Sequence, residues 1–278
     1  LLEARDLVRR RLCGTVSSGV SPLQQPLLLC LGLVLTGPLV CGASQVVNDW
    51  FDREVDAINE PDRPIPSGRV PGAIGLYFAI IWSLISLAWA GLLGTWVLIA
   101  TALALLLAWA YSAPPLRLKL NGWWGNAAVG FSYEGLAWVT GAAVMLGGQM
   151  PPLPVIALAL LYSLGAHGIM TLNDFKSIDG DRRLGIRSIP ARYGARRAAQ
   201  LACAVMIVPQ VAVIALLMYW SKSLAAASVL GLLLLQVLAM IRLLRDPRAM
   251  APWYNATGVS LYVLGMLCSA YAIGSSAL

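Results

Sequence analysis

Residues 95–112 read TWVLIATALALLLAWAYS, a run of 18 residues that contains no charged side chain. An α-helix rises about 1.5 Å per residue, so this run is about 27 Å long, close to the thickness of a bilayer's hydrocarbon core. Further segments along the chain share its apolar character. The sequence therefore predicts an all-α fold, a polytopic bundle integral to a membrane, with eight spanning helices over residues 23–47, 74–92, 95–112, 125–147, 153–172, 198–220, 223–243 and 255–274.

The composition supports the membrane interpretation. Hydrophobic residues make up 59% of the 278-residue chain and charged residues only 12%, whereas a soluble domain carries about 25% charged residues. Disorder is excluded, because disordered chains combine low hydrophobicity with high net charge. The net charge of +7 is more typical of the cytoplasmic loops of a membrane protein than of nucleic-acid binding. Five isolated cysteines and a single histidine predict neither a disulfide framework nor a multi-histidine metal centre.

Charged and uncharged loops alternate along the chain. Fifteen of the 20 Lys and Arg residues lie in four loops or at the adjoining helix ends, namely 48–73, 113–124, 173–197 and 244–254. Cytoplasmic loops carry an excess of basic residues, so these loops are expected to face the cytoplasm. Nothing in the composition indicates a soluble domain, and a single domain is expected to cover residues 1–278.

Residues 1–20 form an atypical N-terminal segment in this scheme. Arg5, Arg9, Arg10 and Arg11 precede a helix that must run toward the cytoplasm, which places four positive charges on the opposite side. Two explanations stay open. Either this segment is an amphipathic helix on the membrane surface, or a spanning helix expected there is missing.

Two clusters of polar residues follow predicted helices. The first contains Asn48, Asp49, Asp52 and Asp56, where Asn48, Asp52 and Asp56 share one helical face. The second contains Asn173, Asp174, Asp179 and Asp181. Asp174 and Asp181 are seven residues apart and share a face if that segment is helical. Four predicted helices separate the clusters, so both lie on the same side of the membrane, as expected of a parallel repeat with a site at its interface.

The chemistry of these clusters favours a metal-bound diphosphate. Carboxylates packed together repel one another, and Mg²⁺ removes the conflict by binding one or two carboxylates together with phosphate oxygens. We therefore expect two Mg²⁺ ions on one diphosphate. Basic residues suited to phosphate surround the clusters: Arg63, Arg69, Arg117, Lys119, Lys176, Arg182 and Arg187. The alternative is a solvated loop in which arginines balance the acids and mark topology. A nucleotide-binding P-loop motif is absent from the sequence, so nucleotide-driven transport has no support.

Three stretches resemble a known family. Residues 48–56 (NDWFDREVD) with 59–68 (NEPDRPIPSG), 111–119 (YSAPPLRLK) and 173–182 (NDFKSIDGDR) are similar to the first aspartate motif, the next cytoplasmic loop and the second aspartate motif of the intramembrane (UbiA-type) prenyltransferases. The likeness runs from about residue 13 to the C-terminus. It is strongest for the chlorophyll synthase branch. Three shorter stretches look more like its bacteriochlorophyll-type members than the plant type: 121–126 (NGWWGN), 133–135 (YEG) and 165–168 (GAHG).

The resemblance implies a reaction, a location and a set of partners. The reaction is Mg²⁺-dependent transfer of a geranylgeranyl or phytyl group from its diphosphate to the propionate carboxylate of a (bacterio)chlorophyllide. The expected location is a bacterial inner (intracytoplasmic) membrane with the active site facing the cytoplasm. Expected partners are the prenyl diphosphate, the Mg-tetrapyrrole, the lipid bilayer and proteins of photosynthetic assembly, but no nucleic acid. The family has nine spanning helices, so the resemblance implies that the first is missing or altered over residues 1–12.

The same resemblance assigns roles to individual residues. The catalytic set is Asp49, Asp52, Asp56, Asp174 and Asp181. The metal ligands are Asn48, Asp49, Asp52, Asp56, Asp174, Asp179 and Asp181. The substrate-binding set is Asn48, Arg63, Arg117, Lys119, Asn173, Lys176, Arg182, Glu134, His167, Trp123 and Trp124. One departure is Ser177, which stands where many relatives carry another Asp.

Several alternatives stay open. Glu134, inside a predicted span, serves either the reaction or a structural hydrogen bond. His167 is either a ligand of the tetrapyrrole magnesium or a packed core histidine, and Trp123 and Trp124 either stack on the macrocycle or anchor helices. The rival functions are a quinone- or haem-type aromatic prenyltransferase, a carrier and a non-catalytic pigment-binding protein.

Overall fold

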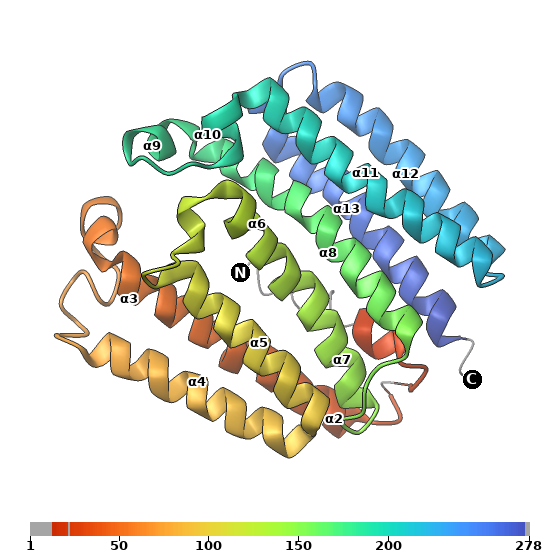
Figure 1. The fold of residues 1–278 in the computed structure, drawn as a ribbon, viewed down its shortest axis with the longest axis horizontal. Helices are drawn as coiled ribbons and strands as arrows, with labels where there is room; N and C mark the ends of the chain where they lie inside the picture. Colours follow the sequence, from red (N-terminus) through yellow and green to blue (C-terminus); the bar gives the residue numbers. More distant parts are fainter. Residues whose placement is uncertain (1–12, 22, 276–278) are drawn as a thin grey trace.

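The computed structural model describes residues 13–21 and 23–275, and Figure 1 shows an arrangement of long helices with short connecting turns. Within these ranges no strand forms, and the backbone pairing outside helices includes one isolated bridge, between Asn121 and Arg187. The elements in chain order are α2 (Pro26–Val34), η1 (Leu35–Cys41), α3 (Gly42–Asn59), α4 (Ile74–Leu93), α5 (Thr95–Ser112), η2 (Leu118–Leu120), α6 (Gly122–Gly130), η3 (Phe131–Leu136), α7 (Ala137–Met145), α8 (Leu153–Asn173), η4 (Asp174–Lys176), α9 (Ile178–Arg183), α10 (Ile189–Tyr193), α11 (Ala195–Tyr219), α12 (Ser223–Leu243) and α13 (Pro247–Gly274).

The all-α prediction is confirmed, and most predicted spans have a structural counterpart. Among the described residues, seven stretches are long and apolar enough to cross a membrane: Pro26–Ile58, Ile74–Leu93, Thr95–Ser112, Leu153–Lys176, Ala195–Tyr219, Ser223–Leu243 and Pro247–Gly274. The predicted span 125–147 falls on α6, η3 and α7, which follow one another without a gap but do not meet the same criteria. Seven of the eight predicted spans therefore have a candidate counterpart among the described residues.

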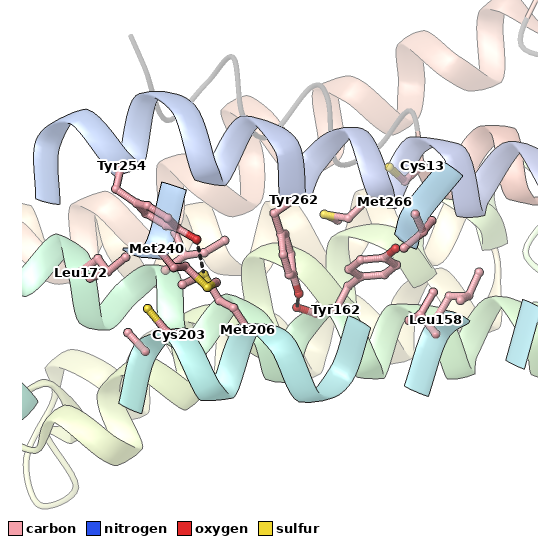
Figure 2. Packing of buried hydrophobic residues seen from close by; sticks show 14 of the residues in the cluster. Cys13, Leu158, Tyr162, Leu172, Cys203, Met206, Met240, Tyr254, Tyr262 and Met266 are labelled. Atoms are coloured by element: carbon pink, nitrogen blue, oxygen red, sulfur yellow. Dashed lines mark hydrogen bonds between the residues drawn. The ribbon is translucent and has the colours of Figure 1, made fainter. Parts of the chain in front are cut away.

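The C-terminal half contains the larger hydrophobic core. Helix α8 packs against α11 and α13, and α12 packs against both α11 and α13. Figure 2 shows Tyr162, Tyr254 and Tyr262 of this core lying between the helices, with the Tyr254 hydroxyl directed at the Met206 sulfur. The Tyr262 hydroxyl donates to the Tyr162 carbonyl oxygen at 2.7 Å, and the Tyr162 and Ser269 hydroxyl oxygens lie 2.8 Å apart. These bonds satisfy polar groups that would be costly to leave unpaired in an apolar interior.

Two π-helical turns, η1 and η3, interrupt the α-helical segments of the N-terminal half. Helix α3 contacts α4 and α5, while η1 joins α2 to α3. Pro38 lies inside η1 and lacks a backbone N–H, and its carbonyl oxygen accepts a hydrogen bond from Trp82 Nε1 at 2.8 Å. The second π-helical turn, η3, lies between α6 and α7. Such turns reposition side chains within a helix and occur frequently at functional sites.

The charged loops gather at one end of the molecule, called here the charged-loop end. It comprises the loops 60–73 and 113–121 and the segment 174–194. Figure 1 shows α9 and α10 at this end, on the same side as the end of α3. The loop 113–121 and the segment 174–194 are joined by backbone hydrogen bonds, because Arg187 donates to Leu120 at 3.0 Å and Gly122 donates to Arg187 at 2.9 Å.

Two local predictions differ from the structure. The first span was expected to end at residue 47, but α3 continues to Asn59, and Pro61 follows the helix end. The segment 174–181 is not one helix, because a 3₁₀ turn ends at Lys176 and α9 begins at Ile178. Asp174 and Asp181 therefore do not share a face of one helix.

The N-terminal segment is described only in part. Residues 13–17 are helical, and Cys13 and Ser17 are buried. The Trp138 indole donates to the Ser17 hydroxyl at 2.9 Å, so this part packs against α7 and is not a surface helix. The predictions on residues 1–12, including their four arginines and the altered first helix, fall outside the described residues.

Candidate functional site

The first acidic cluster lies on the last three turns of α3. Arg63, from the loop that follows α3, reaches back to it. Its Nη1 atom lies 3.2 Å from Asp49 Oδ1 and 3.0 Å from Asp56 Oδ2, so one guanidinium bridges two carboxylates. A hydrogen bond to Glu60 raises the pKa of Arg63 above its usual value. The arginine thus occupies a position between carboxylates that a metal cation could also take.

Asp52 has a second set of cationic partners. Lys119, from the loop after α5, donates to Asp52 Oδ1, and Arg117 Nη2 lies 3.6 Å from the same oxygen. Asn48 Nδ2 donates to Asp52 Oδ2 at 3.0 Å, which agrees with the expected shared helical face. Burial lowers the pKa of Lys119 below its usual value, although its bond to Asp52 opposes this shift.

The second acidic cluster is held by hydroxyl and amide groups. Asn126 Nδ2, on α6, donates to Asp174 Oδ2 at 3.1 Å. The hydroxyls of Ser177 and Ser188 both donate to Asp181 Oδ2, at 3.0 and 2.5 Å. Ser177, the departure noted above, therefore acts as a hydrogen-bond donor to the neighbouring carboxylate.

One cavity of about 490 Å³ connects the two clusters and extends into the bundle. Its wall includes Asn48 and Arg63 from the first cluster and Asn173 and Asp174 from the second. The Tyr111 side chain, also on the wall, lies within electrostatic reach of Asp52, Asp174 and Asp181. The remaining wall is contributed by one face each of η1–α3, α5 and α6–η3–α7, together with Met170 of α8. The cavity thus has a polar mouth at the charged-loop end. Deeper in the bundle its wall combines apolar side chains with polar ones such as Ser44, Gln45 and Ser132.

The donor set fits a hard cation bound with phosphate. The part of the chain that the structure describes contains no group of three or more His, Cys, Asp or Glu side chains arranged to hold a metal ion. Mg²⁺ commonly takes only one or two carboxylates and completes its shell with water and phosphate oxygens. The oxygen atoms of Asn48, Asp52 and Asp174 are suitable ligands. Asp52 is now paired with the Lys119 ammonium, and Asp174 accepts from the Asn126 amide.

Many predicted site residues are not wall residues of this cavity, and these include Asp49, Asp52, Asp56, Asp181, Arg117 and Lys119. Asp179 is 70% exposed and pairs with Arg248 at 3.4 Å. Arg182 is exposed and donates to the Ala191 carbonyl oxygen at 3.3 Å, and Lys176 is exposed. Glu134 is buried on η3 and is not a wall residue.

His167 and the two tryptophans form a separate group. His167 Nε2 lies 3.1 Å from the Trp123 carbonyl oxygen, and the two rings are 5.3 Å apart. Trp123 is partly exposed and Trp124 is 66% exposed. Neither the histidine nor the tryptophans belong to the cavity wall, so their predicted role in substrate binding has no support from the cavity itself.

Sequence reasoning did not assign a role to three residues that hold the site. Asn126 lies within the stretch 121–126 that resembles the family, but nothing in the spacing of Asn126, Ser188 or Asn255 indicated a function. Asn126 binds Asp174, Ser188 binds Asp181, and Asn255 Nδ2 donates to Asn173 Oδ1 at 2.8 Å. The sequence could have indicated such residues only as polar side chains inside apolar runs. That pattern predicts a buried hydrogen bond, but it does not identify the residue at the other end of the bond.

Comparison with other sequences gives consistent matches. The profile of the UbiA prenyltransferase family covers residues 14–272. The chain is 55% identical over 262 residues to the bacteriochlorophyll synthase 33 kDa chain of Cereibacter sphaeroides, covering 94% of this chain and 86% of that protein. It is 39% identical over 276 residues to the chloroplastic chlorophyll synthase of Avena sativa, covering 94% of this chain and 71% of that protein.

The fold also matches solved structures. A structure of digeranylgeranylglyceryl phosphate synthase aligns with a TM-score of 0.74 and 22% identity, covering 98% of this chain and 94% of that chain. A UbiA homolog from Archaeoglobus fulgidus bound to DMAPP and Mg²⁺ aligns with a TM-score of 0.68 and 18% identity, covering 93% of this chain and 96% of that chain. At these identities the likeness establishes a shared fold.

Proposed function

We propose a reaction for this chain, which belongs to the UbiA prenyltransferase family and is therefore a prenyltransferase integral to a membrane. It transfers a geranylgeranyl or phytyl group from its diphosphate to the propionate carboxylate of a (bacterio)chlorophyllide. Relatives named bacteriochlorophyll synthase and chlorophyll synthase support this choice of substrates. The observation that carries the proposal is a cavity whose wall includes Asn48 from the first cluster and both Asn173 and Asp174 from the second.

The reaction exchanges one C–O bond for another. The bond between the allylic carbon and the diphosphate oxygen breaks, and the diphosphate leaves with the electron pair. A carboxylate oxygen of the acceptor then forms the new ester bond to the same carbon. The acceptor carboxylate is ionised at neutral pH, since a comparable side chain has a pKa of about 4.3, so no general base is needed.

The residues that would hold Mg²⁺ come from both clusters: Asn48, Asp49, Asp52, Asp56, Asp174 and Asp181. Mg²⁺, when bound, supplies positive charge that stabilises the leaving diphosphate. A homologous fold bound to DMAPP and Mg²⁺ supports this requirement. Asp179 is left out, because it is exposed and paired with Arg248.

In this proposal the basic side chains Arg63 and Lys119 also bind the diphosphate. Arg63 and Lys119 now neutralise the carboxylates of α3. If those carboxylates held Mg²⁺, Arg63 and Lys119 would be available to donate to the diphosphate oxygens. They would thereby orient the diphosphate at the cavity mouth, with the prenyl tail directed into the interior of the bundle.

The interior of the cavity keeps water from the reacting carbon. An allylic cation reacts readily with water, so a dry cavity protects it until the acceptor carboxylate arrives. The cavity volume of about 490 Å³ suits one substrate tail and leaves little room for a tetrapyrrole macrocycle. The macrocycle would therefore stay near the mouth and insert only its propionate.

The orientation in the membrane follows from the charged-loop end. Its basic loops favour the cytoplasmic side of a bacterial inner membrane, which would put the cavity mouth on that side. Photosynthetic assembly partners remain a prediction.

Offering alternative acceptors tests the proposal directly. Purified protein with Mg²⁺ and geranylgeranyl diphosphate would receive chlorophyllide or 4-hydroxybenzoate, and products would be separated by mass. We expect the chlorophyllide ester only, and no ester from the Asp52→Asn variant. Prenylated 4-hydroxybenzoate would favour the aromatic-ring function instead, and pigment retention without any product would favour a binding protein.

A further inference from the structure

Five exposed arginines gather at the charged-loop end of the C-terminal half. One lies on α10, two lie at the start of α11, and two lie at or just after the end of α12: Arg192, Arg196, Arg197, Arg242 and Arg245. Figure 1 shows the start of α11 next to the end of α12, beside α10. We call these five residues the arginine patch.

The packing of α11 against α12 brings the members of the patch to similar levels. The two helices are antiparallel neighbours, and Gln210 Nε2 on α11 donates to Gln236 Oε1 on α12 at 2.7 Å. Arg197 precedes Gln210 by about 20 Å along α11, and Arg242 follows Gln236 by about 9 Å along α12. The two arginines therefore lie on the same side of this bond, about 11 Å apart along the helix axes, with Arg245 between their levels.

The protein leaves the charge of the arginine patch unneutralised. Among the residues that the structure describes, no ion pair includes a member of the patch, whereas the basic side chains beside α3 and Arg248 are paired with carboxylates. Asp246, the acid next to Arg245, caps α13 by accepting from the Ala249 N–H at 3.2 Å. The patch therefore has an excess of positive charge that an external anion can neutralise.

The helix faces that lead to the patch are apolar. Three residues on α12 and two on α11 are more than half exposed: Leu234, Leu238, Ile241, Val208 and Val211. On each helix they share one face, and the same face continues at helical spacing to Arg245 on α12 and to Arg197 on α11. Exposed apolar faces of a membrane protein are covered by lipid tails, so the patch lies where the headgroups of those lipids are.

Aromatic rings orient two of the arginines. Arg242 Cζ lies 4.6 Å from the centroid of the Trp253 ring on α13, and Arg192 Cζ lies 5.1 Å from that of Tyr193. Stacking occupies the face of a guanidinium and leaves the N–H donors along its edge, where they can bind two oxygens of one phosphate. The patch thus presents oriented phosphate donors beside a lipid-covered surface.

We propose that the arginine patch binds the headgroup of an anionic phospholipid whose tails lie along the exposed faces of α11 and α12. The lipid phosphate accepts from Arg242 and Arg245, and the other arginines neutralise the negative charge around it. Basic clusters that directly border spanning helices are suited to anionic lipids. The adjoining apolar faces favour a lipid over a free phosphate or an acidic protein segment. No member of the patch is a wall residue of the central cavity, so this site is separate from the proposed reaction.

Displacement of a tail-labelled phosphatidylglycerol tests the proposal. The intact protein in neutral detergent would bind this probe, measured by fluorescence anisotropy, and unlabelled phosphatidylglycerol, phosphatidylcholine or inorganic phosphate would compete. We expect phosphatidylglycerol to displace the probe and the other two to fail at the same concentration. Arg242→Gln/Arg245→Gln should weaken probe binding by about 25-fold, since each basic side chain at an anionic lipid surface contributes about fivefold. Arg196→Gln/Arg197→Gln should act in the same direction.

Two basic residues outside the patch provide the control. Arg183 is exposed on α9 and Lys222 precedes α12 at the opposite end, so Arg183→Gln/Lys222→Gln removes the same charge and should leave probe binding unchanged. The proposal is overturned if phosphatidylcholine competes as well as phosphatidylglycerol, or if the control variant weakens binding as much as the patch variants do. Displacement by inorganic phosphate would instead indicate a free-anion site. Unchanged binding in both patch variants would also refute the lipid site and leave an acidic protein partner as the occupant.

Discussion

Replacing Lys119 with methionine is expected to strengthen Mg²⁺ binding while it weakens catalysis. In the structure Lys119 contacts Asp52, and the two side chains are only 13% and 21% exposed. Lys119→Met removes the ammonium that competes with a metal ion for this carboxylate. The same change removes a charge that the proposed function assigns to the leaving diphosphate. Replacing a lysine with a purely structural role would not strengthen Mg²⁺ binding and weaken catalysis at the same time.

The size of the effect follows from the geometry. Two unit charges about 4 Å apart interact by about 4 kcal/mol at an effective dielectric constant near 20. Arg117 remains 3.6 Å from the same oxygen, and solvent screens a pair that is partly exposed. We therefore expect about 1.4 kcal/mol in favour of Mg²⁺, which is about a tenfold lower Kd. Loss of one positive charge at the diphosphate should lower kcat/KM by about a hundredfold.

Calorimetric titration with Mg²⁺ in the absence of diphosphate measures the first effect, and ester formation from geranylgeranyl diphosphate and chlorophyllide measures the second. Lys222 begins the α12 region at the end opposite the charged loops, so Lys222→Met serves as the control and should change neither quantity. Unchanged or weaker Mg²⁺ binding by Lys119→Met would refute the idea that this lysine occupies a metal-binding carboxylate.

Three further predictions concern the supports of the site and the metal. Asn255→Ala removes the 2.8 Å bond to Asn173, so it should lower kcat or raise KM for the prenyl diphosphate by about tenfold with little change in Tm, measured by steady-state kinetics and thermal unfolding. Gly122→Ala places a Cβ atom 2.5 Å from the Ile189 nitrogen and should destabilise the protein by about 1–3 kcal/mol. In the control variant Gly231→Ala the new Cβ atom has no neighbour within 4 Å, so Tm should not fall. Equal Tm values for the two variants would contradict the packing argument. Chelation of divalent ions by EDTA should abolish ester formation and added Mg²⁺ should restore it, so turnover that persists in EDTA would exclude the metal requirement.

The sequence predicted those parts of the site that depend on local periodicity. Asn48 and Asp52 were expected on one helical face, and the bond between them agrees with that placement. The helix that carries them was expected to end at residue 47, because the hydrophobic pattern ends there. Helix formation depends on the backbone as well as on apolar side chains, and α3 continues through polar residues until Pro61 prevents a further turn.

Contacts between distant segments could not be obtained from spacing. Asn126 binds Asp174 across 48 residues, and Lys119 reaches Asp52 across 67 residues. These pairs depend on how α5, α6 and α8 pack, which no local pattern encodes. The solvent exposure of individual side chains could not be predicted from the sequence either. Asp179 and Asp181 are two residues apart in the same acidic stretch, but one faces solvent and the other is buried against Ser188.

The central claim is that both acidic clusters serve one prenyl transfer at the mouth of one cavity. The most direct measurement is the joint yield of prenyl ester and diphosphate from purified protein supplied with Mg²⁺, geranylgeranyl diphosphate and chlorophyllide. We predict equal amounts of the two products from the unchanged protein and loss of both from Asp52→Asn and from Asp174→Asn, each with its fold retained by thermal unfolding. Ester formation at the full rate in either folded variant would contradict the claim.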